Sequence, residues 1–458
     1  MVKGKDLIEL GYKQGKWFKE ALDYINKNNV EGETMRNYLD SLQPPPMLPL
    51  HESSIPYYEN IAAENEIEEK NILLVRRTMQ SLMRTPTVVG GAIMPDACLA
   101  GPMGSIPVGG VVVTKKAIHP GMHSADICCS VMLTNLGKVG PKKVLDAAHL
   151  STHFGPGGRE SKDQYKLPAE LLGKFKSNRY LNHQKSLQLA HSHLGTQGDG
   201  NHFLYVGTSK KTGDTVVVTH HGSRGVGAVL YNSGMKIAEM FRKNISKDTA
   251  HFNAWIPSDT KEGETYWEAL QFIRDWTKEN HTVIHQNICK KLEIGYNTRY
   301  WNEHNFVFKE DDLFYHAKGA TPMKTSFMPD VNGPQIIPLN MAQPILLVEG
   351  IEAENNLGFA PHGAGRNMTR TQHKNENMDF TKKQIFDRET KGLDVRFFFD
   401  KIDISELPSA YKNAENVKAQ IKAFNLATIV DEIEPYGCIM AGDYDMPWKV
   451  KRQNAKNK

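Results

Sequence analysis

Residues 361–370 read Pro-His-Gly-Ala-Gly-Arg-Asn-Met-Thr-Arg, so His362 comes directly before a Gly-Ala-Gly turn that is followed by Arg366 and Arg370. Glycine has no Cβ, and such a turn lets a phosphate-bearing ligand come close to the backbone. Arginine side chains form forked hydrogen bonds to phosphate oxygens. A histidine in this setting is either a phosphate-binding donor or a nucleophile that attacks phosphorus. The alternative is an ordinary surface turn.

Further histidines lie in other turns rich in glycine, serine or asparagine. They are His202 in segment 194–203, His220 in segment 220–225 and His304 at the start of segment 304–307; upstream, Asp126 and Cys129 lie in segment 124–130. A carboxylate, a thiol and several imidazoles on such turns are typical of a metal centre built on loops. Because none of them has the spacing of a local metal motif, a buried thiol and core histidines remain the alternative.

The composition is that of an ordinary globular enzyme: 458 residues, 40% hydrophobic and 24% charged, with a net charge of +4. The mildly basic balance is compatible with nucleic-acid binding without requiring it. No apolar run approaches the roughly 18 residues of a membrane span, and the first residues lack a signal-peptide core. We therefore expect no membrane association and a cytoplasmic location. Five cysteines, two of them adjacent, favour reduced thiols over a disulfide framework.

Hydrophobic periodicity predicts a mixture of helices and strands. The first 45 residues form a helical N-terminal segment that ends at the prolines of 44–46, and residues 449–458 form a basic tail. Further helices are expected at 64–83, 142–154, 166–176, 182–193, 263–292 (the longest) and 413–424. Strands are expected at 106–114, 130–134, 203–206, 215–219, 336–339 and 344–348. With no internal repeat and no clear linker, residues 1–458 are predicted to form a single α+β domain.

Taken in chain order, these segments resemble the RtcB family of RNA-splicing ligases, from about residue 87 to 370. The matching segments are Met94-Pro95-Asp96 through Gly109-Gly110, Asp126-Ile127-Cys128-Cys129, Gly200-Asn201-His202-Phe203, His220 to Gly225, His304-Asn305, Lys318-Gly319-Ala320 and His362 to Arg366. The resemblance implies an α+β fold in which mixed and antiparallel sheets, flanked by helices, surround a central metal-binding cleft.

The resemblance also implies an activity. Members join an RNA 3′-phosphate or 2′,3′-cyclic phosphate end to a 5′-hydroxyl end, in RNA repair or tRNA splicing. His362 matches the histidine that takes GMP from GTP, and Asp96 matches the aspartate that orients it. The implied partners are these RNA ends, GTP and an archease-like activator.

Two manganese ions are the implied metal, although the softness of a thiolate with imidazoles would by itself point to zinc. The implied ligands are Asp126, Cys129, His202, His220 and His304, with Cys129 shared between the ions and Cys128 not a ligand. The expected nucleotide- and phosphate-binding residues are Asn201, Arg224, Asn340, Gly363, Ala364, Gly365, Arg366 and Lys451.

The chain departs from the family pattern near the expected nucleotide. Cys98 stands where the family usually has histidine, Tyr205 stands where it has a guanine-binding glutamate, and 338–342 replaces a Pro-Gly-Ser-Met-Gly turn. These departures leave two other hypotheses open. One is a metal-dependent phosphodiesterase on cyclic-phosphate RNA ends without nucleotide transfer; the other is a non-catalytic module that binds RNA ends.

Overall fold

The computed structural model describes residues 1–42, 47–330 and 332–444. The helices are α1 (Gly4–Glu9), α2 (Trp17–Asn28), α3 (Gly32–Leu42), α4 (Glu66–Leu82), α5 (Pro120–His123), α6 (Pro141–Ser151), α7 (Ala169–Ser177), α8 (Gln184–Ser192), α9 (Arg224–Ile245), α10 (Lys261–Leu292), α11 (Arg370–Glu376), α12 (Lys382–Glu389) and α13 (Ala414–Ala423). The strands are β1 (Tyr58–Glu59), β2 (Val88–Cys98), β3 (Val108–Lys115), β4 (Ala117–Ile118), β5 (Ser130–Asn135), β6 (Phe203–Ser209), β7 (Thr215–His221), β8 (Ile256–Pro257), β9 (Thr298–Glu303), β10 (Asn305–Glu310), β11 (Leu313–Lys318), β12 (Ala320–Pro322), β13 (Gln335–Pro338), β14 (Ile345–Gly350), β15 (Phe359–Pro361), β16 (Asp394–Phe397) and β17 (Ala427–Met440).

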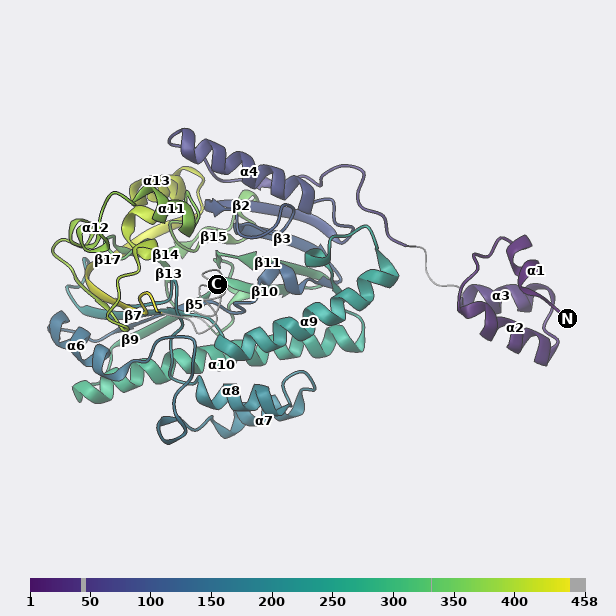
Figure 1. The fold of residues 1–458 in the computed structure, drawn as a ribbon, viewed down its shortest axis with the longest axis horizontal. Helices are drawn as coiled ribbons and strands as arrows, with labels where there is room; N and C mark the ends of the chain where they lie inside the picture. Colours follow the sequence, from purple (N-terminus) through teal and green to yellow (C-terminus); the bar gives the residue numbers. More distant parts are fainter. Residues whose placement is uncertain (43–46, 331, 445–458) are drawn as a thin grey trace, which may run out of the picture.

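Most strands form a larger and a smaller sheet, the larger lying towards the left of the body in Figure 1, whereas β12–β15 and β4–β8 form separate two-stranded sheets. The larger sheet has the order β13-β14-β17-β6-β7-β5-β9, with β16 on β17, and the smaller has the order β1-β2-β3-β11-β10. Most neighbouring strands are antiparallel, whereas the pairs β1–β2 and β16–β17 are parallel. The predicted α+β fold with mixed sheets is therefore confirmed.

Helix α10 is the longest helix of the described chain, as its pattern predicts, and runs beside α9 along one side of the sheets (Figure 1). Its aromatic residues Tyr266 and Trp276 are completely buried, together with Ile273. Full burial of such large side chains stabilises the packing of α10 against the sheets.

Helix α9 is the main element that the sequence did not predict. Its first turns contain Gly225 and Gly227, and Gly234 lies in its middle. Glycine lowers helix propensity by about 1 kcal/mol per residue relative to alanine, so the local sequence argues against this helix. Tertiary packing requires these glycines: a Cβ at Gly234 would lie 2.5 Å from the ring of Tyr266, and one at Gly225 would lie 3.0 Å from the ring of His193.

Helices α1–α3 form a small unit of their own beside the body (Figure 1). Its buried residues are Leu7, Phe18, Ala21, Ile25 and Leu39, and the half-buried side chains that pack on them all lie within residues 2–42. The body begins to form hydrogen bonds at Leu48, whose N–H donates to the carbonyl of Ile245 over 2.7 Å. The predicted helical N-terminus is thus three helices with a separate core. The prediction of one domain over 1–458 stays a prediction, and its basic tail lies outside the described residues.

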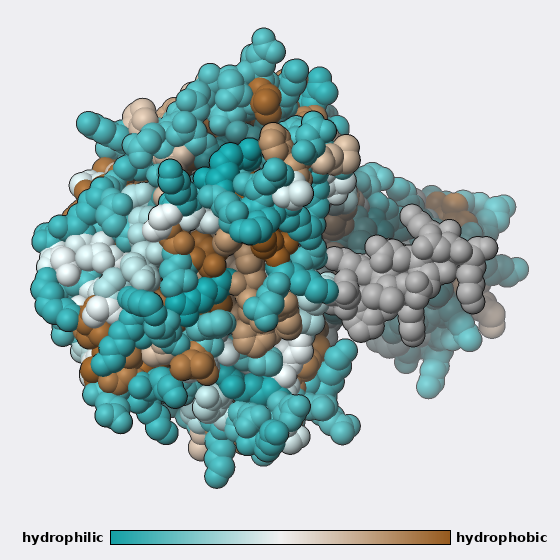
Figure 2. Space-filling model, turned by 60° about the vertical axis from the view of Figure 1, so that its left-hand side comes forward, coloured by the Kyte–Doolittle hydropathy of each residue, from teal (hydrophilic) through white to brown (hydrophobic). Residues whose placement is uncertain are grey.

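The face of the body shown in Figure 2 is mainly hydrophilic, with apolar side chains gathered around a hollow near its centre. Within the described residues, each helix is too short or too polar to cross a membrane.

The separate core of α1–α3 leads to a prediction about stability. A chain that starts at residue 47 should unfold with the same thermal midpoint as the full chain, because removing α1–α3 exposes no side chain of the main core. Calorimetry on both chains measures this. A midpoint lowered by several degrees would show that α1–α3 stabilises the body.

Candidate active site

The candidate metal ligands meet where the larger sheet joins the smaller one. Cys129 directly precedes β5, and His220 lies in β7, the antiparallel neighbour of β5. His304 occupies the single position between β9 of the larger sheet and β10 of the smaller sheet. Asp126 and His202 come from the loops before β5 and β6. Residues separated by up to 178 positions are thereby brought to one place.

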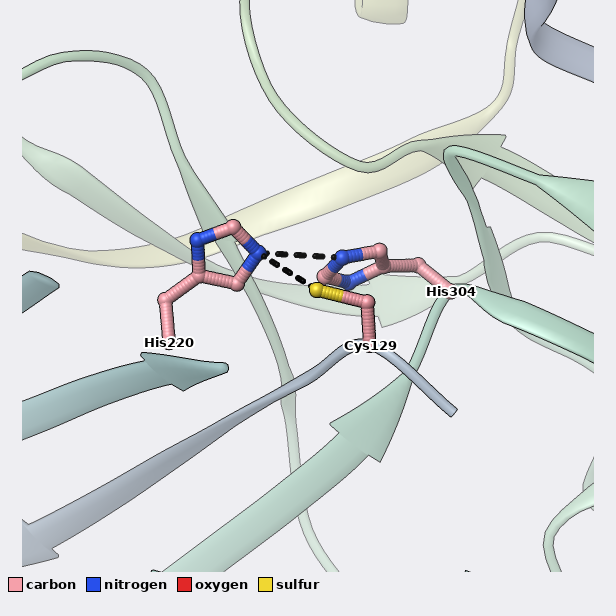
Figure 3. A group of neighbouring side chains, drawn as sticks. All are labelled: Cys129, His220 and His304. Carbon is pink, nitrogen blue, oxygen red and sulfur yellow. Dashed lines mark hydrogen bonds between the residues drawn. The ribbon is translucent and has the colours of Figure 1, made fainter. Parts of the chain in front are cut away.

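Cys129 lies between two groups of possible ligands. Its Sγ is 3.2 Å from Nε2 of His220 and 3.8 Å from Nε2 of His202. Nε2 of His220 is in turn 3.2 Å from Nε2 of His304 (Figure 3). On the other side, Nε2 of His202 is 3.4 Å from a carboxylate oxygen of Asp126. Two triads, Cys129–His220–His304 and Asp126–Cys129–His202, therefore share the cysteine, and in each the ligand atoms lie within 4.8 Å of one another.

The protonation states of these groups suit a cation. Burial lowers the pKa of His220 to about 3 and lowers that of His304 well below its ordinary value, so both imidazoles are neutral. Burial, together with the charge of Asp126, raises the pKa of the Cys129 thiol. Burial would also raise the pKa of Asp126, but its hydrogen bond with His202 outweighs this and lowers it to about 2. Neutral imidazoles beside a carboxylate and a thiol that can exchange its proton for a metal make a suitable ligand set.

The neighbouring cysteine plays a different part. Cys128 is absent from both triads and is completely buried in the main hydrophobic core. Its φ of 57° lies in the left-handed region, which glycine adopts without strain.

His362 follows β15 and contacts Asp96 of β2. Its Nδ1 is 2.6 Å from Oδ2 of Asp96, and its backbone N–H donates to the same oxygen over 3.1 Å. The carboxylate can only accept, so Nδ1 carries the proton and Nε2 keeps its lone pair. Asp96 is completely buried, whereas the side chain of His362 is 18% exposed. The ring centroid of His362 lies 4.8 Å from that of His304, which places it beside the candidate metal ligands.

The glycines after His362 have a packing role that the sequence did not reveal. Gly365 has a φ of +72°, and a Cβ on it would lie 2.1 Å from the carbonyl oxygen of Asp96. A Cβ on Gly363 would lie 2.8 Å from the carbonyl oxygen of Pro338. These glycines therefore let the turn lie directly on β2 and on the end of β13, which brings His362 to Asp96.

A cavity of about 170 Å³ opens beside His362. Its walls come from the ends of β2, β6, β13 and β17 and from the turn after His362. The lining residues that the sequence singled out are Cys98, Asn201, Tyr205, His220, Asn340, His362, Gly363, Ala364, Gly365 and Arg366.

Two other lining residues were missed by sequence reasoning. Glu406, which is 2% exposed, accepts hydrogen bonds from Arg366 over 2.6 Å and from the hydroxyl of Tyr411 over 2.7 Å. The guanidinium of Arg366 also lies 4.7 Å from the centroid of the Tyr411 ring. No local motif marks Glu406 or Tyr411, which lie in an irregular segment 40 and 45 residues after Arg366.

The remaining expected phosphate-binding residues are spread around the site. Asn201 lines the cavity next to His202, and its carbonyl oxygen is 3.1 Å from Nδ1 of His220. Arg224 lies outside the cavity, where it donates to the carbonyls of Gly155 and Gly157. Lys451 lies outside the described residues.

Comparison with known proteins identifies the family. A family model described as "tRNA-splicing ligase RtcB" matches residues 158–441, which is more than half of the chain. The chain belongs to the RtcB family. The matched region contains His202, His220, His304 and His362, whereas Asp96, Asp126 and Cys129 precede it.

Individual relatives match over most of their own length. The chain is 28% identical to the tRNA-splicing ligase RtcB of Aeropyrum pernix, over 75% of this chain and 86% of the relative. It is 25% identical to the tRNA-splicing ligase RtcB of Thermococcus kodakarensis, over 82% of this chain and 93% of the relative. It is 27% identical to the RNA-splicing ligase RtcB of Escherichia coli, over 72% of this chain and 85% of the relative. This chain is therefore a divergent member of the RtcB family.

The shared cysteine makes a prediction about metal content. Cys129→Ala should remove most of the bound metal, because it takes one ligand from both triads. Cys128→Ala is the matched control and should keep the metal, because Cys128 belongs to neither triad. Elemental analysis of the purified proteins measures the stoichiometry. The reverse pattern would make Cys128 the ligand.

Proposed function

We propose that the protein is an RNA ligase that joins RNA 3′-phosphate or 2′,3′-cyclic phosphate ends to 5′-hydroxyl ends through a histidine–GMP intermediate on His362. The observation that carries this proposal is the Asp96–His362 pair beside the two triads that share Cys129. Membership of a family whose relatives are named RNA-splicing and tRNA-splicing ligases supports the same activity.

The first step uses the lone pair on Nε2 of His362. Asp96 accepts a hydrogen bond from Nδ1–H and holds the ring, as an orienting carboxylate does in a catalytic triad. Nε2 forms a bond to the α-phosphorus of GTP, and pyrophosphate leaves. As this bond forms, positive charge develops on the imidazole, and the buried carboxylate of Asp96 stabilises that charge.

The later steps transfer GMP to RNA. The 3′-phosphate oxygen of the RNA attacks the phosphorus on His362, which releases the histidine and activates the 3′ end. The 5′-hydroxyl of the second RNA end then attacks the activated phosphate and displaces GMP. A cyclic phosphate must first be opened by water to a 3′-phosphate.

The two triads are proposed to hold two Mn²⁺ ions, with Asp126, His202, His220 and His304 as ligands and Cys129 shared. When bound, such ions supply positive charge that neutralises phosphate oxygens during phosphoryl transfer. Asn201, Arg224, Asn340, Arg366 and the turn 363–365 are proposed to contact the nucleotide and the RNA phosphates, and Lys451 is proposed to join them. RNA repair or tRNA splicing in the cytoplasm, with an archease-like activator, is the proposed setting; its five unpaired cysteines suit a reducing compartment.

The nucleophile can be tested by covalent labelling. Protein incubated with Mn²⁺ and GTP labelled at the α-phosphate should acquire label that survives denaturation but not acid. His362→Ala should abolish this label, because His362 is the imidazole that contacts Asp96 within the described residues. His251→Ala, which removes an exposed histidine outside the cavity lining, should label like the wild type. Label retained on His362→Ala would contradict the assignment.

The orienting role of Asp96 predicts a graded defect. In Asp96→Asn the amide no longer stabilises the positively charged ring, so labelling should slow by about 10²- to 10⁴-fold. Metal content should stay unchanged, because Asp96 belongs to neither triad. Rapid-quench labelling measures the rate, and a rate within a few-fold of the wild type would show that Asp96 only supports the turn.

A further inference from the structure

The wall of the cavity beside His362 offers few groups that distinguish one nucleobase from another. Its lining includes the apolar side chains of Phe203, Leu339, Met341, Ile345 and Met440. Apolar and aromatic side chains bind any base by stacking and burial, because every base has an apolar face. Discrimination between bases therefore depends on the polar groups of the lining.

Tyr205 lies in this wall, but its hydroxyl is engaged within the sheet. The hydroxyl donates to the carbonyl oxygen of Ile433 over 2.8 Å, and the residue is only 2% exposed. Cys438, its pairing partner on β17, is 1% exposed, and burial raises the pKa of its thiol to about 12. This part of the cavity thus presents a phenol ring and a neutral thiol.

The lining, within the described residues, contains one carboxylate, that of Glu406. Its Oε2 accepts from Arg366 and from the hydroxyl of Tyr411, and its Oε1 accepts from Nε of Arg370 over 2.9 Å. A carboxylate held by two guanidinium groups has little remaining capacity to accept from a base. Guanine has donors at N1 and N2 on one edge, and selection of guanine requires acceptors for them.

The amide of Asn340 is the polar group of the 338–341 turn that lines the cavity. Its Oδ1 accepts from the backbone N–H of Ala342 over 3.0 Å, which leaves Nδ2 as a donor and one lone pair of Oδ1 as an acceptor for a ligand. Adenine and guanine each offer both acceptors and a donor on their edges. A single amide, which offers one acceptor and not the two that guanine N1 and N2 require, therefore binds either purine.

We propose that this cavity binds a purine nucleotide without selecting guanine, so that adenine nucleotides occupy it about as well as guanine nucleotides. This inference rests on the proposed function, because it takes the cavity to be the nucleotide site of the His362 reaction. It changes the substrate class from GTP alone to purine nucleoside triphosphates.

Binding of GMP and AMP to the full-length protein tests the inference separately from the reaction, because the monophosphates cannot transfer to His362. Calorimetry should give dissociation constants that agree within about tenfold, as expected when no paired acceptor reads the base. A larger preference for GMP would overturn the inference. Absence of binding by both would also overturn it, because the cavity would not be a nucleotide site.

Labelling of His362 with GTP and ATP then separates the two proposals. Similar labelling by both nucleotides supports both the proposed function and the inference. Equal binding of GMP and AMP without any labelling would contradict nucleotide transfer while leaving the base-binding inference standing. Labelling by GTP alone would confirm the transfer and contradict the inference.

A substitution at Asn340 tests how the cavity could acquire selectivity. In Asn340→Asp one carboxylate oxygen still accepts from Ala342, and the other replaces Nδ2 by an acceptor for guanine N1 and N2. The ratio of GMP to AMP affinity should rise by about tenfold or more. Asn65→Asp is the matched control, since Asn65 accepts from backbone N–H groups at the start of α4, outside the cavity lining. An unchanged ratio in Asn340→Asp would show that Asn340 does not face the base.

Discussion

The backbone hydrogen bond from the N–H of His304 to the carbonyl of Cys129, 2.8 Å long, joins the larger sheet to the smaller one at the candidate metal centre. The thiol and the neighbouring imidazoles gain little from one another while no cation is bound, since each offers only weak or single hydrogen bonds. Their approach therefore depends on the backbone of β5, β7 and the β9–β10 junction. The unfavourable free energy of placing these polar groups together is offset by the packing of both sheets, and a bound metal ion would stabilise the arrangement further.

The same junction places His362, the proposed nucleophile. The N–H of Ala320 in β12 donates to the carbonyl of His304, β12 pairs with β15, and His362 directly follows β15. β2 supplies Asp96. The completely buried carboxylate needs donors, and the ring and backbone N–H groups of His362 provide two. The same two hydrogen bonds thus satisfy the buried carboxylate and orient the ring of His362. A substitution of Asp96 is therefore expected to affect both the stability of this region and the orientation of the histidine.

The lining of the cavity combines charged side chains with a neutral wall. Arg366, which lines the cavity together with His362, is held by Glu406 and lies over Tyr411, so its guanidinium has a fixed position. Towards β6 and β17, the hydroxyl of Tyr205 is bound to backbone. The proposed reaction and the proposed base binding therefore involve different residues of the cavity.

Local sequence determined the helices and strands with strong periodicity, such as α10 and β7, and it marked the turns that carry His202, His220, His304 and His362. It could do so because burial pattern and turn chemistry act over a few residues. The family resemblance also predicted the candidate ligands that the fold brings together in the two triads. Only the tertiary structure decided that Glu406 holds Arg366, that the hydroxyl of Tyr205 donates to the carbonyl of Ile433, and that the glycine-rich segment 224–245 is a helix. These features depend on contacts between segments that are distant in the sequence. The local sequence of one segment does not show how strongly such contacts stabilise it.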